Sequence, residues 1–195
     1  MNIKQQKQIR AFLIEALGND DGSRLFALQE EKLRTLIANT QGKTKNQMKT
    51  LTQTILPRIA LYQALSDAGF SQDAITQHMR TYMMTKVAAQ KHAFTAKVEH
   101  FPGFYAIYSA IFLKIMRTTD LQQSTQVRGK GYYDITIQEC LWHTACVENG
   151  CPALCRLFCD VDDVTYGGLK KIAFSRTQTL GYGGHCCDFH FYKKS

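Results

Sequence analysis

The C-terminal part of the chain concentrates side chains that can act as nucleophiles, proton carriers or metal ligands. The sequence has seven cysteines, and all of them lie between residues 140 and 187. The stretch from 158 to 191 adds aspartates, histidines and glycines in quick succession. Thiolates attack electrophilic carbon or bind metal ions, and carboxylates transfer protons. This composition predicts either a reactive site or a metal-binding site near the C-terminus.

The cysteines are expected to be reduced. Their number is odd, and the amphipathic N-terminal segment lacks the apolar core of a secretion signal. Both observations favour a cytoplasmic protein without structural disulfides. Free cysteine is also a common small core residue, and packing roles are expected for four of the seven. These four are Cys146, Cys151, Cys155 and Cys186.

The last expected strand sorts its side chains by alternation between two faces. Cys187, Phe189 and Phe191 fall on one face, and the two phenylalanines mark this face as inward. Asp188 falls on the other face. The Cys187 thiol is therefore expected to point toward the core.

A hairpin is expected between strands at 171–180 and 186–194, joined by the glycine-rich "GYGGH". If it pairs Thr179 with Cys187, the Thr179 side chain faces the core beside that thiol, and Ser175 faces the same way. Cys159 ends a short helix just before an acidic turn. Four side chains are then expected to converge, with Asp162 near by: Cys140, Cys159, Cys187 and Thr179.

Two further polar residues, His185 and Arg176, each fit two different roles. His185 lies in the glycine-rich loop, where exposure is the default, although an acid–base role at the rim of a pocket also fits. Arg176 could hold the carboxylate of a substrate, because a guanidinium binds carboxylate in a bidentate geometry. It could equally be a structural partner of Asp188. Both readings stay open at this point.

The elements that must position these residues change character along the chain. Apolar residues at helical spacing predict helices over 24–39, 47–67, 72–90 and 104–117. Residues 118–131 read as a linker, and "YYDITIQEC" (132–140) reads as a strand. The expected fold class is α+β, with a helical N-terminal half followed by an antiparallel-sheet C-terminal half with short helices. The expected division is a helical region over 1–120 and a cysteine-rich α+β region over 121–195, within one compact domain (1–195).

The bulk charge narrows the expected partners. The formal net charge is +8, but the basic residues of the N-terminal half are scattered and match no nucleic-acid-binding signature. No segment is long and apolar enough to cross a membrane. A small, anionic substrate is expected instead, with neither nucleic acid nor membrane as a partner. The apolar helices over 47–67 and 104–117 would suit a homodimer interface or a pocket lid.

The motifs of the C-terminal part resemble a known family. They run from "ENG" (148–150) through "FCDVDD" and "FSRTQTL" to "GGHCCDFHF", and "ILPRIALYQALSDAGFSQDAI" (55–75) precedes them. Together they resemble the L-2-amino-thiazoline-4-carboxylic acid hydrolase family, over roughly residues 50–192. The matching positions are Cys140, Cys159, Asp162, Arg176, Thr179, Cys187 and Asp188.

The resemblance implies a hydrolase acting on non-peptide C–N bonds in a cyclic amidine. A 2-aminothiazoline carboxylate would take up water and open to N-carbamoyl-L-cysteine or an analogue. In one mechanism Cys159 or Cys187 attacks the ring carbon as a thiolate. In another, Cys140, Cys159 and Cys187 hold Zn²⁺, which lowers the pKa of a bound water. In both, Asp162 or Asp188 would carry the proton, and substrate would be held with help from Arg176, His185 or Cys140.

A second resemblance supports a different class of function. The Cys and Thr spacing is distantly similar to small-molecule-sensing domains of the 4-vinyl-reductase type, in which a Glu and three cysteines bind zinc. Cys140 stands here at the position of the Glu, and Thr179 at the position of one Cys. The alternative function is a non-catalytic sensor or binding domain with structural or zinc-binding cysteines. No cofactor is required for the thiol mechanism, and zinc is the one that the alternatives imply.

Overall fold

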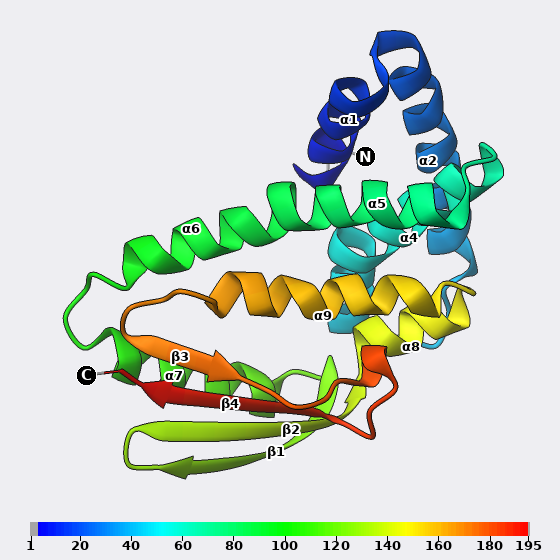
Figure 1. Ribbon diagram of the computed structural model, residues 1–195. Helices are drawn as coiled ribbons and strands as arrows, with labels where there is room; N and C mark the ends of the chain where they lie inside the picture. The colour runs from blue at the N-terminus through cyan, green and yellow to red at the C-terminus, as the bar shows by residue number, and fades with distance from the viewer. Residues whose placement is uncertain (1–3, 195) are drawn as a thin grey trace. The chain divides into compact units, whose positions relative to one another are not determined.

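The computed structural model describes residues 4–194, and it confirms the predicted α+β class (Figure 1). Helices make up the N-terminal half, and an antiparallel sheet with short helices follows. The described residues form two compact units, which we call unit 1 (residues 4–82 and 145–154) and unit 2 (residues 83–144 and 155–194). The expected division at residue 120 stays a prediction, and its residues 1–3 and 195 lie outside the described range.

Unit 1 is built from helices whose buried leucines and isoleucines form its core. The expected helices over 24–39 and 47–67 are present. The second is interrupted by a π-helical turn, and Pro57 lies in the first turn of the helix that follows this interruption. Proline lacks the N–H that would continue the helical ladder, which accounts for the interruption. The helical segments are α1 (Lys4–Leu17), α2 (Asn19–Asn39), α3 (Lys45–Thr50), the π-helical turn η1 (Leu51–Ile55), α4 (Leu56–Asp67) and α5 (Gln72–Thr81).

Unit 2 holds the sheet and most of the remaining helices. The helix expected over 72–90 starts at the predicted cap Ser71 and continues through a π-helical turn to Val98. Helices α8 and α9 each have residues in both units. The elements are η2 (Tyr82–Ala88), α6 (Ala89–Val98), α7 (Phe104–Thr118), β1 (Gln122–Gly129), β2 (Tyr132–Cys140), α8 (Leu141–Glu148), α9 (Pro152–Tyr166), β3 (Ile172–Ser175), the 3₁₀ turn η3 (Leu180–Tyr182) and β4 (Cys187–Lys193).

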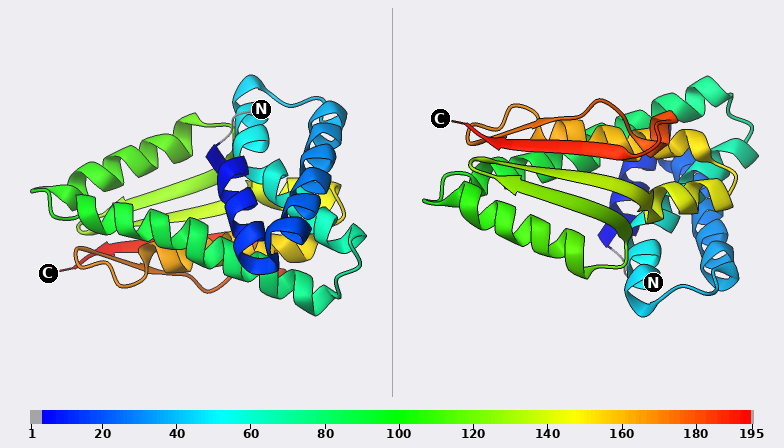
Figure 2. Two further views of the ribbon diagram at one scale, coloured as in Figure 1. Left: turned by 90° about the horizontal axis from the view of Figure 1, so that it is seen from above. Right: turned by 90° about the horizontal axis from the view of Figure 1, so that it is seen from below.

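The sheet has four antiparallel strands in the order β1-β2-β4-β3. The right-hand view of Figure 2 shows the hairpin of β1 and β2 beside the red strand β4. The expected linker over 118–131 is wrong, because most of it forms the edge strand β1. Its polar sequence, QQSTQVRG, gives no apolar alternation, and the strand is held by its backbone ladder to β2.

The hairpin register also differs from the expected one. Phe174 pairs with Phe191 and Ser175 pairs with His190, and β3 ends at Ser175. The ladder does not continue beyond Ser175, because the backbone N–H groups of Thr177 and Gln178 donate to the Asp188 carboxylate instead of to a partner strand. Ser175 therefore lies on the face opposite to Cys187, which corrects the expectation that the two share a face.

One face of the sheet carries the core of unit 2. Tyr133 and Phe191 are fully buried there, and their rings stack with centroids 4.8 Å apart. Phe112 of α7 and Tyr166 of α9 pack against Phe191 from the helical side. The alternation predicted for β4 is confirmed, since its odd-numbered residues 187, 189 and 191 are buried. We call this the inner face and the opposite one the outer face.

Among the described residues, no helix combines the length and the hydropathy that a membrane span needs.

Candidate functional site: a buried thiol cluster beside Asp162 and Arg176

Helix α9 presents a line of reactive side chains on one face. Cys155, Cys159, Asp162 and Tyr166 follow one another at intervals of four, three and four residues, so they lie along one side of the helix. Pro152 fits its first turn because the nitrogen there needs no hydrogen-bond donor. Gly168, with φ +74°, follows its last residues in a left-handed conformation. The sequence thus fixes the spacing of a thiol pair and a carboxyl along one rigid element.

Cys187 lies at the start of β4, on the inner face. It is 5% exposed, and its Sγ accepts a hydrogen bond from the backbone N–H of Leu180 at 3.4 Å. Burial raises the pKa of the Cys187 thiol, while the Leu180 hydrogen bond acts in the opposite direction. The site thus contains a thiol whose anionic form has one fixed N–H donor.

Cys159 is engaged with two neighbouring side chains. Its hydrogen bond to Cys155 holds the proton on Cys159 and, together with burial, raises the pKa of the Cys159 thiol well above its ordinary value. A hydrogen bond from Thr179 opposes this shift. Thr179 is itself buried, and its hydroxyl oxygen accepts from the N–H of Tyr182 at 3.2 Å. Cys155, expected only to pack, is therefore part of the cluster.

The loop of η3 closes directly over this thiol pair. A Cβ added to Gly181 would lie 2.9 Å from the Cys159 sulfur and 3.1 Å from the carbonyl carbon and oxygen of Cys155. Such contacts are tighter than ordinary packing, so a side chain at this position would displace the Cys159 sulfur or the loop. Gly181, the first glycine of "LGYGG", thus allows the loop to approach the helix closely, and its place in the sequence does not reveal this contact.

Cys140 completes the group at the end of β2. Burial raises the pKa of the Cys140 thiol to about 12, and the nearby sulfurs of Cys155 and Cys187 contribute in the same direction. The structure therefore brings together Cys140, Cys159, Cys187 and Thr179, as the sequence predicted, although the hairpin register that led to this prediction is different.

Asp162 lies one helical turn beyond the thiols and is only partly exposed. Burial raises the pKa of its carboxyl to about 6, against the opposing charges of Lys91 and Arg176. Its charge also acts on Cys187. A carboxyl with a pKa near neutrality can both take up and release a proton under physiological conditions.

Arg176 connects the end of β3 to α9. Its Nη2 donates to the Asp163 carboxylate at 2.5 Å and to the backbone oxygen of Cys159 at 3.1 Å. The ion pair is with Asp163, so the expected alternative of an Asp188 partner is wrong. Its side chain is 9% exposed, and no described residue accepts a hydrogen bond from its buried Nη1. An unpaired buried donor costs free energy, and an acceptor on a ligand would recover it.

Asp188 and His185 lie away from the thiols. Asp188, on the outer face, accepts hydrogen bonds from the N–H groups of Thr177 at 3.0 Å and Gln178 at 2.8 Å. Burial alone would raise the pKa of Asp188, but these hydrogen bonds outweigh it and lower the pKa. The side chain of His185 is exposed, and its backbone N–H donates to the Gln178 side chain. Asp188 therefore shapes the loop that carries Thr179.

The zinc alternative requires three thiols that converge on one point. In the part of the chain that the structure describes, no group of three or more His, Cys, Asp or Glu side chains is placed to hold a metal ion. The Cys159 sulfur is directed to Cys155 and Thr179 instead. Cys140, Cys159 and Cys187 thus do not fit a zinc ion.

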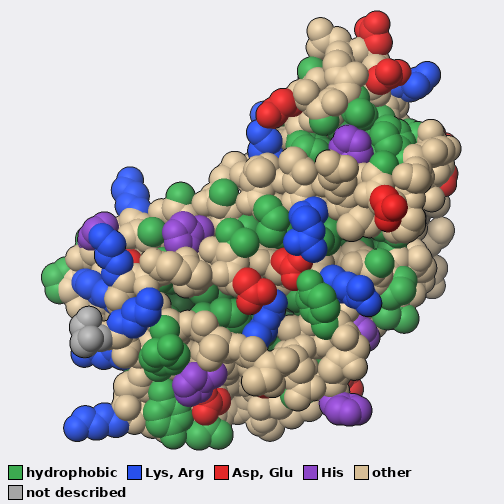
Figure 3. Space-filling view, viewed as in Figure 1, with side chains coloured by type: hydrophobic (Ala, Val, Ile, Leu, Met, Phe, Trp, Pro, Cys, Tyr) green, Lys and Arg blue, Asp and Glu red, His purple; other side chains and the backbone are tan. Residues whose placement is uncertain are grey.

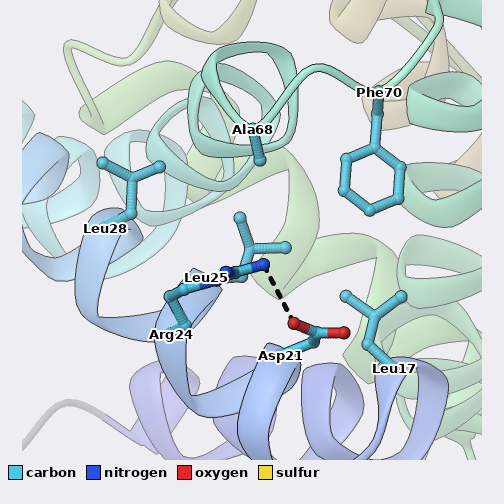
Figure 4. A pocket seen from close by; sticks show the side chains of 7 residues that line it. All are labelled: Leu17, Asp21, Arg24, Leu25, Leu28, Ala68 and Phe70. Carbon is cyan, nitrogen blue, oxygen red and sulfur yellow. Dashed lines mark hydrogen bonds and ion pairs between the residues drawn. The ribbon is translucent and has the colours of Figure 1, made fainter.

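Two open pockets lie on the surface. One, of about 420 Å³, lies over the outer face of the sheet, and its walls include Arg176 as well as Asp188 and His190. The other, of about 530 Å³, lies in unit 1 between apolar side chains such as Leu25 and Phe70 (Figure 4). Its charged groups, Asp21 and Arg24, pair with each other at 2.9 Å. The unit 1 pocket contains none of the predicted site residues.

Sequence reasoning missed three contributors to the site. The spacing of Cys155 and Cys159 by four residues was a usable signal, since such pairs meet on a helix. Tyr166 follows Asp162 at the same spacing, and its phenol hydrogen-bonds to Tyr108 of α7. Gly181 gave no such signal, because its role depends on a contact between loop and helix.

A search of curated proteins gives no match. Among solved structures, the Fe(II) unliganded H-NOX protein from K. algicida aligns at a TM-score of 0.33 and 10% identity, covering 97% of this chain and 95% of that one. A point mutant of that protein aligns at a TM-score of 0.31 and 11% identity, covering 96% of each chain. These scores are too low to indicate a shared fold.

The family comparison gives a match over most of the chain. The sequence model of the family described as L-2-amino-thiazoline-4-carboxylic acid hydrolase matches residues 47–191. This range includes α9, the sheet and every residue of the thiol cluster. The chain therefore belongs to the L-2-amino-thiazoline-4-carboxylic acid hydrolase family.

Proposed function

We propose that this protein is a hydrolase that opens a small cyclic amidine bearing a carboxylate, of the 2-aminothiazoline-4-carboxylate type. The product would be N-carbamoyl-L-cysteine or an analogue. Membership of the hydrolase family supports the class of reaction. The observation that carries the site is the cluster of Cys140, Cys155, Cys159 and Cys187 beside a carboxyl with a pKa near 6.

Arg176 supplies the group that would bind the substrate carboxylate. Its guanidinium is mostly buried, is fixed by Asp163 and the Cys159 backbone, and has an Nη1 donor left over. A fixed guanidinium loses little conformational freedom when it binds a carboxylate. This interaction would hold the ring next to the helix face that carries the thiols.

Cys187 is the better nucleophile of the two that the sequence left open. The Cys159 proton is held in a hydrogen bond with Cys155, whereas Cys187 already accepts a hydrogen bond from Leu180. Asp162 acts electrostatically on Cys187 and, with a pKa of about 6, is largely ionised at neutral pH. It would serve as the base that takes the thiol proton.

The chemistry then balances in two steps. The Cys187 sulfur attacks the C=N carbon of the ring, and the departing ring sulfur takes the proton from Asp162. The bond that breaks is the carbon–sulfur bond of the ring, in place of the C–N bond that the sequence led us to expect, because the ureido product keeps both nitrogens on this carbon. Water next attacks the same carbon, releases Cys187 and leaves a ureido group on the product. The net change is the addition of one water. Cyclic amidines of this class are protonated readily, so the ring carbon is already electrophilic when it binds.

The test is a turnover assay read by mass spectrometry. Wild type, Cys187→Ser, Cys159→Ser and the control Cys186→Ser are incubated with L-2-amino-thiazoline-4-carboxylate, and a product heavier by one water is measured. We expect loss of about 100-fold or more for Cys187→Ser. A smaller loss is expected for Cys159→Ser and none for Cys186→Ser. Equal rates for wild type and Cys187→Ser would refute the nucleophilic role.

A non-catalytic binding domain is the second candidate. It is favoured by one observation, namely that burial raises the pKa of Cys140 and Cys187, which keeps both thiols neutral. Saturable binding of the same compound by calorimetry, without product in the assay above, would select this candidate. Binding that disappears in Arg176→Lys would then still assign the carboxylate contact.

A further inference from the structure

Three polar side chains stand in a row across the outer face of the sheet. Asp134 of β2 lies directly opposite His190 of β4, and Ser175 of β3 lies directly opposite His190 on its other side. Because β4 lies between β2 and β3, the order across the sheet is carboxylate, imidazole, hydroxyl. Directly opposed residues point to the same side of a sheet with Cβ atoms about 4.5–5.5 Å apart.

This row is accessible from solution and separate from the thiol cluster. The side chains of His190 and Asp134 are 46% and 37% exposed, and Ser175 is exposed. Cys187 and Phe189 point to the inner face from the same strand β4. In Figure 3 an imidazole and a carboxylate lie side by side over the strands, next to hydrophobic side chains.

The imidazole is oriented by the carboxylate. Nδ1 of His190 hydrogen-bonds to Oδ1 of Asp134. A carboxylate in this position holds the proton on Nδ1, so that Nε2 carries the free lone pair. The rings of Tyr192 and Tyr132 lie 5.5 Å and 6.0 Å from the His190 ring and limit its other orientations.

A pocket of about 420 Å³ opens over the row. Its walls include Asp134, His190 and Ser175 together with Thr136, which pairs with Asp188 across the strands. The Thr136 hydroxyl can donate to a developing oxyanion, a requirement for acyl transfer. Arg176 also lines this pocket, but its charge is paired with Asp163. The two acidic residues of the face, Asp134 and Asp188, therefore disfavour anionic compounds and favour neutral or cationic ones.

We propose that this outer-face row is a second catalytic site, an acyl-transfer centre that hydrolyses small neutral carboxylic esters. Ser175 is the nucleophile, His190 the base, and Asp134 the group that orients the imidazole. The Ser175 oxygen attacks the ester carbonyl carbon while its proton passes to Nε2 of His190. The carbon–oxygen bond to the alcohol breaks, and the alcohol leaves with that proton. Water, deprotonated by His190, then releases the acid and restores Ser175.

The test labels the serine directly. Full-length protein carrying Cys187→Ser, to remove the thiol background, is treated with a fluorophosphonate probe, and the modified residue is identified by peptide mass mapping. We expect an adduct on Ser175, no adduct there in Ser175→Ala, and labelling at least 10-fold slower in His190→Gln and Asp134→Asn. Ser66→Ala, which removes an exposed serine of unit 1, is the matched control and should label as the parent does. Hydrolysis of p-nitrophenyl acetate should fall in parallel.

Rescue separates a chemical role from a structural one. Added imidazole should restore labelling in His190→Ala, and the melting temperature of each variant confirms that it is folded. An unlabelled Ser175 in the folded parent protein, or equal labelling with and without His190, overturns the proposal. Ring-opening activity at the thiol cluster is measured separately in the chain with Cys187 intact, so failure of one site is distinguishable from failure of the other.

Discussion

The guanidinium of Arg176 donates to the backbone oxygen of Cys159 at 3.1 Å, and this contact ties the end of β3 to the helix turn that carries the thiol pair. The same nitrogen donates to Asp163 at 2.5 Å, one turn further along α9. An exposed arginine on a loop would be free to move with it. Here a single side chain fixes the spacing between strand and helix and leaves one nitrogen for a ligand.

Replacing this arginine tests both roles. Arg176→Lys removes the fork geometry, since one ammonium cannot reproduce the contacts to Asp163 and to Cys159 together. We expect a loss of unfolding free energy on the order of 1–3 kcal/mol in urea. The KM for a carboxylate substrate should rise with a smaller change in kcat. Arg156→Lys, an exposed change on the same helix, is the control and should leave both quantities nearly unchanged.

The Asp162 carboxyl should make stability depend on pH. Its pKa rises from 3.8 to about 6 on folding because burial disfavours the charged form. A raised carboxyl pKa means that the folded state binds the proton more tightly, so its contribution to stability is present below pH 3.8 and is lost as the pH rises to about 6. Asp162→Asn does not titrate, and should gain up to about 3 kcal/mol over wild type between pH 4 and pH 7. Urea unfolding at the two pH values measures this gain, and a difference independent of pH would contradict it.

The same group should shape the activity profile. If Asp162 takes the thiol proton, it must be ionised at the start of each cycle, so turnover should fall as the pH drops below about 6. Asp162→Asn should lose this limb of the kcat/KM profile together with most of the rate. The measurement is ring opening from pH 4.5 to 8, and a wild-type profile that is flat through pH 6 would exclude Asp162 as the base.

The close approach of the η3 loop to α9 should be sensitive to one added methyl group. In Gly181→Ala the new Cβ would meet the Cys159 sulfur at 2.9 Å and the Cys155 carbonyl group at 3.1 Å. Overpacking of this kind costs about 1–3 kcal/mol. Adding Cys159→Ala to the variant removes the sulfur, so part of the loss should return in the double-mutant cycle, as thermal melting can measure. Strictly additive losses would show that the contact is not the cause.

Asp188 should stabilise its loop only while it is ionised. Asp188→Asn weakens the acceptor for Thr177 and Gln178 and should cost about 1–2 kcal/mol at pH 7. Hydrogen bonding lowers the pKa of Asp188, so its contribution is present above the ordinary aspartate value of 3.8 and is lost as the pH falls below it. The difference between wild type and variant should therefore shrink toward pH 3. Chemical unfolding at pH 7 and pH 3.5 gives the comparison.

The sequence by itself determined the local elements and the residue types of the site. Apolar residues at helical spacing predicted α4 and α7. Alternation predicted β2, because this strand buries one apolar face that its own sequence displays. Alternation in β4 correctly placed Cys187 inward. The family motif was readable because it consists of chemically distinctive residues.

Only the tertiary structure decided what depends on contacts between segments far apart in the chain. The polar strand β1 exists through its ladder to β2, and the strand β3 stops at Ser175 because Asp188 captures the next N–H groups. The register of β3 on β4 pairs Phe174 with Phe191, and this pairing places Ser175 on the outer face opposite His190. Likewise, the pairing of Arg176 with Asp163 and the approach of Gly181 to Cys159 are long-range contacts. Side-chain type and period constrain one segment at a time, whereas a register is set by hydrogen bonds between two of them.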